Sequence, residues 1–183
     1  MDRSLVEQAQ RGDRDAFAGL VHAVGDRLYA LAYRILRDPD LARDACQEAL
    51  IAAWRQLPAL RDPDRFDAWI YRILVHACYA ESRKRSRWSA TIRVLEVDGG
   101  PPPDGGLSIH DRDELERAFR LLPIDQRTVF VLHHHIGLPL VEIAETLGIP
   151  AGTVRSRLHY ATQALRRSIN EAVDPTTSRE RSA

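Results

Sequence analysis

Four arginines lie within a thirteen-residue segment near the end of the chain, and no acidic residue separates them: Arg155, Arg157, Arg166 and Arg167. Guanidinium groups suit phosphate recognition because they donate several hydrogen bonds and stay charged at any physiological pH. Apolar residues recur through the same segment at helical spacing, at Val154, Leu158, Ala161 and Leu165. The pattern predicts a helix with Leu158 turned inward and basic side chains on its other faces.

A second, shorter helix is predicted directly before this basic helix. Residues 140–147 repeat apolar side chains on one face, at Leu140, Ile143, Ala144 and Leu147. Gly148 can adopt a positive φ at little cost, so the chain can turn sharply there, and Pro150 suits the first turn of a new helix. Together these features indicate a helix-turn-helix whose second helix enters the DNA major groove. The alternative is an ordinary helical hairpin with a solvated basic face.

A second basic region precedes it in the chain. Between Arg72 and Arg93 there are six basic residues and one acidic residue, Glu81, for a local charge of +5. Aromatic and imidazole side chains alternate with basic side chains in and beside this region, at Tyr71, His76, Tyr79, Arg83, Lys84 and Arg85. Such a mixture suits single-stranded nucleic acid, since bases stack while cations meet phosphates. The alternative for the basic residues is structural, because cationic side chains near a helix C-terminus interact favourably with the helix dipole without any ligand. Phe66 and Trp69 are expected in the hydrophobic core and not as surfaces on which nucleobases stack.

An acidic segment lies between these basic regions and the N-terminus. Residues 38–48 hold four acidic residues against Arg43, a local charge of −3, while the whole chain is neutral, with 26 basic and 26 acidic residues. A protein that held DNA unaided would usually be basic. The segregated charge therefore predicts two nucleic-acid contacts and a third surface for a different, basic partner.

The sequence contains no clear pattern for a metal site or for catalytic residues. His133, His134 and His135 are adjacent, so on a helix they point in different directions and cannot converge on one ion. Cys46 and Cys78 lack metal-type spacing and are predicted to be buried thiols. We find no phosphate-binding glycine loop and no nucleophile motif, so we predict no catalytic residue, metal or cofactor. A metal hydrolase using the three histidines is the enzyme alternative, and it requires stoichiometric metal.

The chain is predicted to be all-α, with two small helical domains. The first domain (1–87) begins with a helix capped at Ser4, with Glu7 completing a capping box, and Asp13 and Asp38 cap the next two helices. Leu41 and Trp54 are expected to face its core. Residues 88–110 form a flexible linker that contains VDGGPPPDGG. The second domain (111–172) carries the helix-turn-helix, with Asp125 as the cap of an inner helix, and residues 173–183 form a disordered tail.

Localisation follows from what the sequence lacks. The first residues are polar and carry no signal-peptide core, and no apolar run approaches the roughly 18 residues of a membrane span. We therefore expect a cytoplasmic protein without direct membrane insertion.

Three motifs resemble the extracytoplasmic-function (ECF) subfamily of bacterial RNA polymerase sigma factors. DLARDACQEALIAAWRQL resembles the family's core-polymerase-binding helix, and RFDAWIYRILVHACYAESRKR resembles the helix that recognises and melts the promoter minus-ten element. LLPIDQRTVFVLHHHIGLPLVEIAETLGIPAGTVRSRLHYA resembles the minus-thirty-five recognition domain. The match covers nearly all of residues 1–170, in the family's order.

The resemblance implies a role for each set of residues. Core RNA polymerase, through the clamp helices of its largest subunit, would contact Asp44, Gln47, Glu48, Ile51 and Arg55. Melted minus-ten DNA would contact Tyr71, His76, Tyr79, Arg83, Lys84 and Arg85. Double-stranded minus-thirty-five DNA would contact Thr153, Arg155, Ser156, Arg157, His159 and Tyr160. The linker would run through the polymerase, and an anti-sigma factor would clamp the two domains in response to stress or another signal.

The sequence departs from the family's pattern at four of these positions or beside them. His76 stands where an asparagine is frequent, Ala80 replaces an aspartate, Tyr160 replaces an arginine and Leu50 replaces a phenylalanine. Imidazole lacks the two-sided amide pattern of asparagine, which puts the preferred minus-ten base in question. The alternative to a sigma factor is a stand-alone helix-turn-helix regulator, which would leave the acidic segment and the first basic region unexplained.

Overall fold

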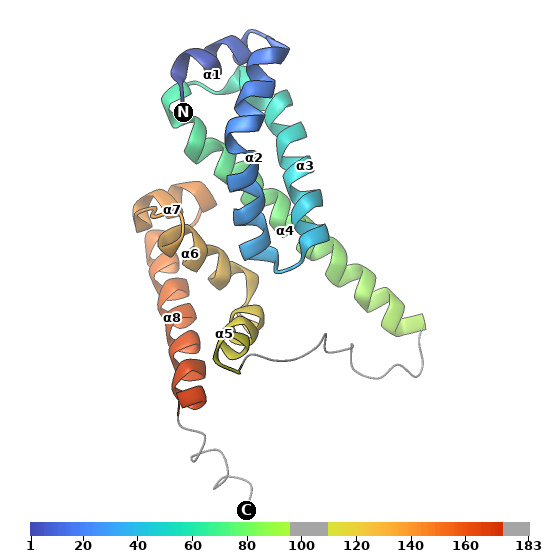
Figure 1. Cartoon of the computed structure of the whole chain (residues 1–183), viewed down its shortest axis with the longest axis vertical. Helices are drawn as coiled ribbons and strands as arrows, with labels where there is room; N and C mark the ends of the chain where they lie inside the picture. The colour runs from blue at the N-terminus through green and yellow to red at the C-terminus, as the bar shows by residue number, and fades with distance from the viewer. Residues whose placement is uncertain (96–109, 174–183) are drawn as a thin grey trace, which may run out of the picture. The chain divides into compact units, whose positions relative to one another are not determined.

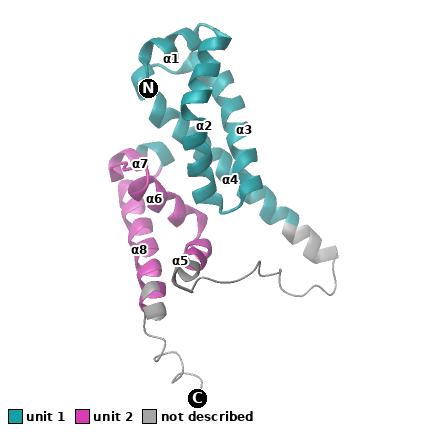
Figure 2. Ribbon diagram, viewed as in Figure 1, with its two compact units in different colours: residues 1–95, 145–148 teal, residues 96–144, 149–183 magenta. Residues whose placement is uncertain are grey.

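The computed structural model describes residues 1–95 and 110–173, and every regular element in these two ranges is a helix (Figure 1). The chain divides into two compact units (Figure 2). The first comprises residues 1–95 and 145–148, and the second comprises the other described residues. Within the described ranges no helix combines the length and apolarity that crossing a bilayer requires. The expected all-α, two-part architecture is confirmed. The VDGGPPPDGG segment lies outside the described residues. Of the predicted tail, residues 173–183, Val173 is the last residue of α8 and the rest lies outside the described residues.

The first unit is built on three long helices that pack against one another. It contains α1 (Arg3–Gln10), α2 (Arg14–Leu36), α3 (Pro39–Gln56) and α4 (Phe66–Leu95), with two 3-10 turns, η1 (Leu57–Ala59) and η2 (Pro63–Arg65), before α4. Helix α3 packs against both α2 and α4, and α2 also contacts α4. Helix α4 continues to Leu95, so the predicted linker start at residue 88 is wrong. Residues 89–95 extend the helix instead.

Aspartates begin the first three helices. Asp13 accepts hydrogen bonds from the amides of Asp15 and Ala16, and Asp38 caps α3 in the same way, as predicted. The cap of α1 is Asp2 and not Ser4, because the Asp2 carboxylate accepts the Ser4 amide at 2.9 Å. The chain enters helical geometry two residues earlier than a Ser4 cap requires. The predicted capping box is therefore wrong.

Helix α3 packs through alanine. Ala42, Ala45, Ala49 and Ala53 are all buried, and these short side chains let the backbones of neighbouring helices come close. The two large residues assigned to this face lie elsewhere: Leu41 is half-buried, and Trp54 is 37% exposed with its ring 4.8 Å from that of Phe17. The core face of α3 thus consists of alanines, and its large and charged side chains lie on the other faces.

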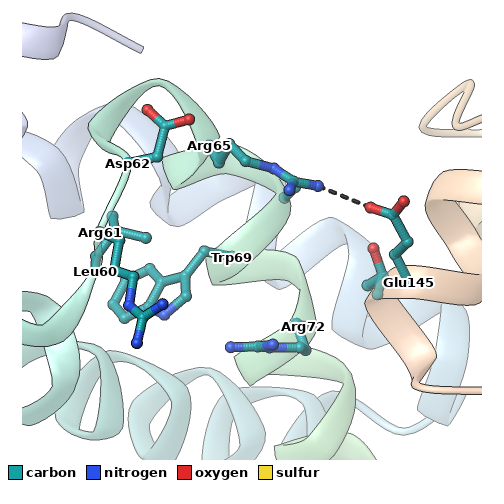
Figure 3. A pocket seen from close by; sticks show the side chains of 9 residues that line it. Leu60, Arg61, Asp62, Arg65, Trp69, Arg72 and Glu145 are labelled. Carbon is teal, nitrogen blue, oxygen red and sulfur yellow. Dashed lines mark hydrogen bonds and ion pairs between the residues drawn. The ribbon is translucent and has the colours of Figure 1, made fainter.

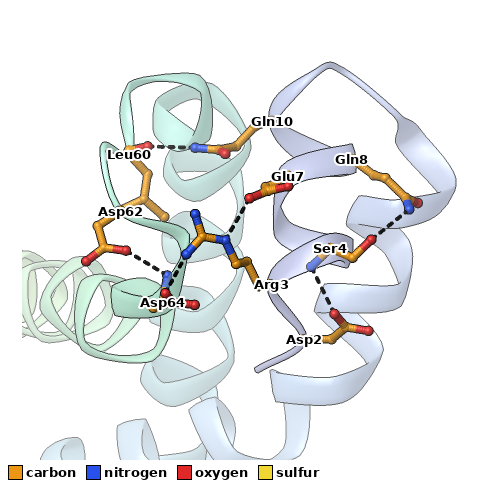
Figure 4. A network of polar contacts seen from close by, with 9 residues as sticks. All are labelled: Asp2, Arg3, Ser4, Glu7, Gln8, Gln10, Leu60, Asp62 and Asp64. Atoms are coloured by element: carbon orange, nitrogen blue, oxygen red, sulfur yellow. Dashed lines mark hydrogen bonds and ion pairs between the residues drawn. The ribbon is translucent and has the colours of Figure 1, made fainter.

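The N-terminal helix α1 braces the loop before α4 (Figure 4). The amide nitrogen of Gln10 donates to the carbonyl oxygens of Leu57 and Leu60 at 3.2 and 2.6 Å, and Arg3 pairs with Asp64 at 2.6 Å. The Leu57 carbonyl also accepts the Leu60 amide within η1, so the Gln10 side chain adds a donor there and ties α1 to the turn. Helix α1 therefore fixes the entry into α4.

The second unit packs around helix α8. It contains α5 (His110–Leu121), α6 (Ile124–His134), α7 (Leu140–Leu147, of which residues 145–147 group with the first unit) and α8 (Ala151–Val173). Helix α8 packs against α5 and α6. The shared core is formed by Ala118, Leu122, Ala161 and Leu165, with Phe119, Phe130 and Ala164 around it. Of the apolar residues predicted on the inner face of α8, Val154, Ala161 and Leu165 are buried and Leu158 is half-buried.

The junction of α5 and α6 depends on an arginine. Arg127 is 8% exposed, and its guanidinium donates to the carbonyls of Arg120 and Leu122 at 2.9 and 2.8 Å, which caps the end of α5. Helix α6 begins after Pro123 without any side-chain cap. The prediction of Asp125 as a cap is wrong, because Asp125 lies inside the first turn of α6.

Candidate polymerase and nucleic-acid interfaces

Helix α3 turns all five candidate polymerase contacts to the surface. Asp44, Gln47, Glu48, Ile51 and Arg55 are each exposed, because the alanine face takes up the packing against α2 and α4. Ile51 and Trp54 are both 37% exposed and add apolar area among the charges. Aromatic residues and arginine are enriched at protein interfaces, so the exposed Trp54 and Arg55 give this strip a feature of a protein-binding surface.

The far end of α4 presents the predicted basic cluster. Arg83, Lys84 and Arg85 are exposed, and so is His76, whereas Tyr79 is half-buried. Lys84 lies 3.5 Å from the carboxylate of Glu81, and Arg85 pairs with Asp38, the cap of α3. The side chain of Arg85 remains 56% exposed, so it can still meet a phosphate.

Tyr71 does not share this surface. It is 6% exposed, and burial, the largest of several influences, raises the pKa of its phenol. Tyr71 falls one residue after Ile70 on the helix, which places it on the edge of the packed face rather than with His76. Contact between Tyr71 and a nucleic acid stays a prediction, and the burial of the Tyr71 ring does not support it.

A groove between α3 and α4 joins two predicted sites. It is lined by Glu48 and Gln56 from α3 and by Arg72, His76 and Glu81 from α4. A neighbouring hollow is lined by Asp44, Arg83 and Trp88 among others. The candidate polymerase residue Glu48 and the candidate promoter residue His76 therefore border one depression.

The structure adds exposed residues that the sequence did not single out. Trp88 is 70% exposed beside the basic cluster, and its only signal in the sequence was a large ring among charges. At the start of α4, Arg61, Arg65 and Arg72 border a hollow that also contains Trp69 and Leu60 (Figure 3). Arg61 and Arg65 precede the helix in sequence, so helical spacing could not relate them to Arg72.

Helix α8 carries most of the predicted duplex-binding residues on its outer side. Arg155, Ser156, His159 and Tyr160 are exposed, and Thr153 is half-buried at the first turn. Gly148 has a φ of 65°, which confirms the predicted sharp turn before α8. The Ser156 hydroxyl donates to the carbonyl of Thr153 at 3.0 Å. Gln163 is also exposed and shares this side, although as an uncharged residue it gave no signal in the charge pattern.

Arg157 differs from the other members of this set. Its Nε lies 3.0 Å from Oδ2 of Asp125 on α6, and its side chain is 27% exposed. It faces the body of its own unit, whereas Arg155 faces outward.

The three histidines and two cysteines occupy structural positions. The Nδ1 of His133 lies 3.0 Å from the carbonyl oxygen of Leu138, in the turn that follows α6. Burial and then the neighbouring His133 lower the pKa of His134. Among the described residues no group of histidine, cysteine and carboxylate side chains is placed to hold a metal ion. Both cysteines are free thiols, and burial raises the pKa of Cys46 to about 11 and raises that of Cys78 as well.

Comparison with known proteins identifies both halves of the chain. Residues 20–88 match the sigma-70 region 2 family and residues 112–165 match sigma-70 region 4. The chain is 31% identical to the ECF RNA polymerase sigma factor SigW of Bacillus subtilis, over 93% of this chain and 98% of the relative. The chain belongs to the ECF RNA polymerase sigma factors.

Other members of the family extend over similar lengths. The ECF RNA polymerase sigma-E factor of Escherichia coli is 34% identical over 90% of this chain and 92% of its own length. The RNA polymerase sigma-H factor of Pseudomonas aeruginosa is 33% identical over 92% and 93%. Sigma factors are not an enzyme class. All candidate residues on α3, α4 and α8 fall within the matched regions, whereas α1 precedes them.

Solved structures show the same fold. CnrH in complex with the cytosolic domain of CnrY aligns with a TM-score of 0.64 at 27% identity, covering 92% of this chain and 97% of that one. The sigma factor RpoE of Bartonella quintana, in complex with the anti-sigma factor NepR, aligns with a TM-score of 0.67 at 25% identity, covering 84% and 96%.

Proposed function

We propose that this ECF sigma factor binds core RNA polymerase through α3 and directs it to promoters through α4 and α8. The observation that carries the proposal is the division of surfaces within the first unit. The exposed side of α3 is acidic and apolar, and the end of α4 is strongly basic. One small unit thus offers a protein-binding face and a nucleic-acid face side by side.

The proposed contact with polymerase lies on the exposed side of α3. Asp44, Gln47, Glu48, Ile51 and Arg55 would meet the clamp helices of the largest polymerase subunit. The exposed isoleucine supplies apolar contact area, while the carboxylates select a partner with basic side chains. Because the chain as a whole carries no net charge, its affinity for DNA without polymerase should be low.

Promoter recognition would be shared between the two units. His76, Tyr79, Arg83, Lys84 and Arg85 would contact the melted minus-ten strand from the first unit, which we place at residues 1–95. Thr153, Arg155, Ser156, His159 and Tyr160 would contact the minus-thirty-five duplex from the second, at residues 110–173. The residues between the units would set the reach between the two promoter elements.

Regulation by an anti-sigma factor is supported by relatives of similar fold. One of these was solved with an anti-sigma factor and another with the cytosolic domain of a second protein. A partner seated in the groove that Glu48 and His76 share would block polymerase and promoter together. We propose that this protein works in the cytoplasm under such control and responds to stress or another signal.

A charge reversal on α3 tests the proposal. Purified Glu48→Arg protein should fail to comigrate with core polymerase and should lose run-off transcription from promoter fragments, because the new cation repels a basic partner. Arg43→Glu is the matched control: it reverses an exposed charge on the same helix but outside the five residues, and it should still comigrate. Wild-type protein that forms no complex with core enzyme at micromolar concentration would refute the proposed function.

A stand-alone helix-turn-helix regulator makes the opposite prediction. Such a protein would bind a specific duplex tightly without polymerase and would need only the second unit. That alternative gives the first unit no role, whereas residues 20–88 of this unit match sigma-70 region 2.

A further inference from the structure

We propose that Arg157 is a positioning residue of the minus-thirty-five module, held by Asp125, and that it is not a ligand of DNA phosphate. This inference rests on the proposed function, because it concerns how α8 meets duplex DNA. It separates Arg157 from Arg155, two residues away, although both are arginines in the same basic stretch.

The direction of the side chain follows from helix geometry. Successive residues are rotated by about 100° around an α-helix. Val154, Ala161 and Leu165 are buried and define the inner side of α8. Arg157 lies only about 60° from the middle of that inner side, whereas Arg155 and His159 lie more than about 90° away. The backbone therefore points Arg157 along the flank that faces α6.

The partner of Arg157 is itself fixed in place. Oδ2 of Asp125 lies 3.0 Å from Nε of Arg157, and Oδ1 of the same carboxylate accepts the amide of Gln126 at 3.0 Å. Both oxygens are thus engaged, one by the backbone of α6 and one by α8. The first turn of a helix also favours a negative charge, so this position suits the Asp125 carboxylate.

The pair has a consequence for DNA binding. It joins the first turn of α6 to the N-terminal half of α8, the half that contains Thr153, Arg155 and Ser156. A bond at this point limits rotation of α8 against α6 and so fixes the angle at which the outer residues are presented. It also neutralises Asp125, whose carboxylate would otherwise repel the phosphate backbone near that end of the helix.

Salt dependence distinguishes positioning from phosphate contact. Promoter dissociation constants of the full-length protein in holoenzyme are measured over a series of salt concentrations. Each lost phosphate contact to duplex DNA lowers the log–log slope by about 0.9. Arg157→Ala should leave this slope unchanged. It should weaken binding about two- to fivefold, which is the size of effect measured for surface ion pairs. A slope reduced by about 0.9 overturns the inference.

The aspartate gives a test of opposite sign. If Asp125 positions α8 through Arg157, Asp125→Asn should weaken promoter binding. If Arg157 is a phosphate ligand that Asp125 merely competes for, the same substitution frees the arginine and should strengthen binding. Stronger binding by Asp125→Asn therefore overturns the inference.

A charge swap separates positioning from a general loss of folding. Asp125→Arg combined with Arg157→Asp restores an ion pair across the same two helices and should recover affinity relative to Arg157→Asp alone. No recovery, with a far-ultraviolet circular dichroism spectrum equal to that of wild type, counts against positioning. Wild-type holoenzyme that shows no promoter-specific binding refutes the proposed function instead, so the two failures are distinguishable.

Discussion

The basic end of α4 and the basic face of α8 are built in different ways. On α4 the cations follow Glu81, the last buried side chain in the described part of that helix, so Arg83, Lys84 and Arg85 all stay exposed. On α8 the cations are spread along a helix that packs against α5 and α6, so only some face outward. An extended helix end can present every charge, whereas a packed helix must sort its charges by direction.

Each surface also contains one arginine tied to an aspartate near a helix N-terminus. Arg85 pairs with Asp38 of α3, and Arg157 pairs with Asp125 of α6. Arg85 keeps 56% of its side chain exposed but Arg157 only 27%. The comparison indicates that Arg85 can serve both the fold and a ligand, while Arg157 serves the fold. The following experiments test that difference.

The largest expected effect concerns the packing beneath the two surfaces. Leu74 is a fully buried residue of α4, so Leu74→Ala should lower the free energy of unfolding by about 2–5 kcal/mol. Leu158 is half-buried on α8, so Leu158→Ala should cost less than about 2 kcal/mol. Urea denaturation followed by circular dichroism measures both values. Equal losses would show that α8 is packed as tightly as α4.

Arg155→Ala is the outward counterpart of the Arg157 substitution. It should weaken promoter binding by holoenzyme and lower the log-salt slope by about one, because an exposed arginine on the outer side of α8 meets phosphate. Comigration with core polymerase should not change, since α3 is untouched. An unchanged slope would remove the proposed contrast between Arg155 and Arg157.

Asp38→Ala should destabilise the first unit by about 0.5–2 kcal/mol, because it removes the cap of α3 together with the partner of Arg85. Asp38→Asn keeps a capping side chain and should cost less. Thermal unfolding near neutral pH measures both effects. An alanine variant as stable as the asparagine variant would mean that the cap contributes little.

The acid side of the stability profile tests the charge on Asp38. Partial burial opposes its ionisation, but the Leu41 amide and the Arg85 guanidinium outweigh burial, so the pKa of Asp38 is lowered. A carboxylate with a lowered folded-state pKa contributes its full stability above the unfolded value, about pH 4, and loses it as the pH falls through the folded value. Asp38→Asn should therefore lose less stability than wild type between pH 4 and lower pH.

Tyr71→Phe should have the smallest effect on promoter opening. The Tyr71 ring is buried in the first unit, and phenylalanine keeps that ring while removing only the hydroxyl. Arg83→Ala, on the exposed side of the same helix, should reduce open-complex formation measured by permanganate footprinting. A Tyr71→Phe variant as defective as Arg83→Ala would place Tyr71 in contact with the melted strand despite its burial.

The sequence by itself determined the helices and their order. Apolar spacing, the aspartate caps at Asp13 and Asp38 and the turn at Gly148 are local properties, because helix formation and capping depend on residues within a few positions of each other. The three motifs also located the helices that carry the candidate contacts. Spacing failed at the ends of helices: the caps expected at Ser4 and Asp125 lie two residues too late, and α4 continues past the predicted linker start at residue 88 to Leu95.

Only the tertiary structure decided which side chains within those helices are available. Arg155 and Arg157 are the same residue type in the same stretch, and the difference between them lies in Asp125, which is more than 25 residues away in sequence. Tyr71 and His76 share a helix, but packing buries one and exposes the other. Burial and ion pairing depend on what a neighbouring helix brings close, and no local pattern encodes that neighbour.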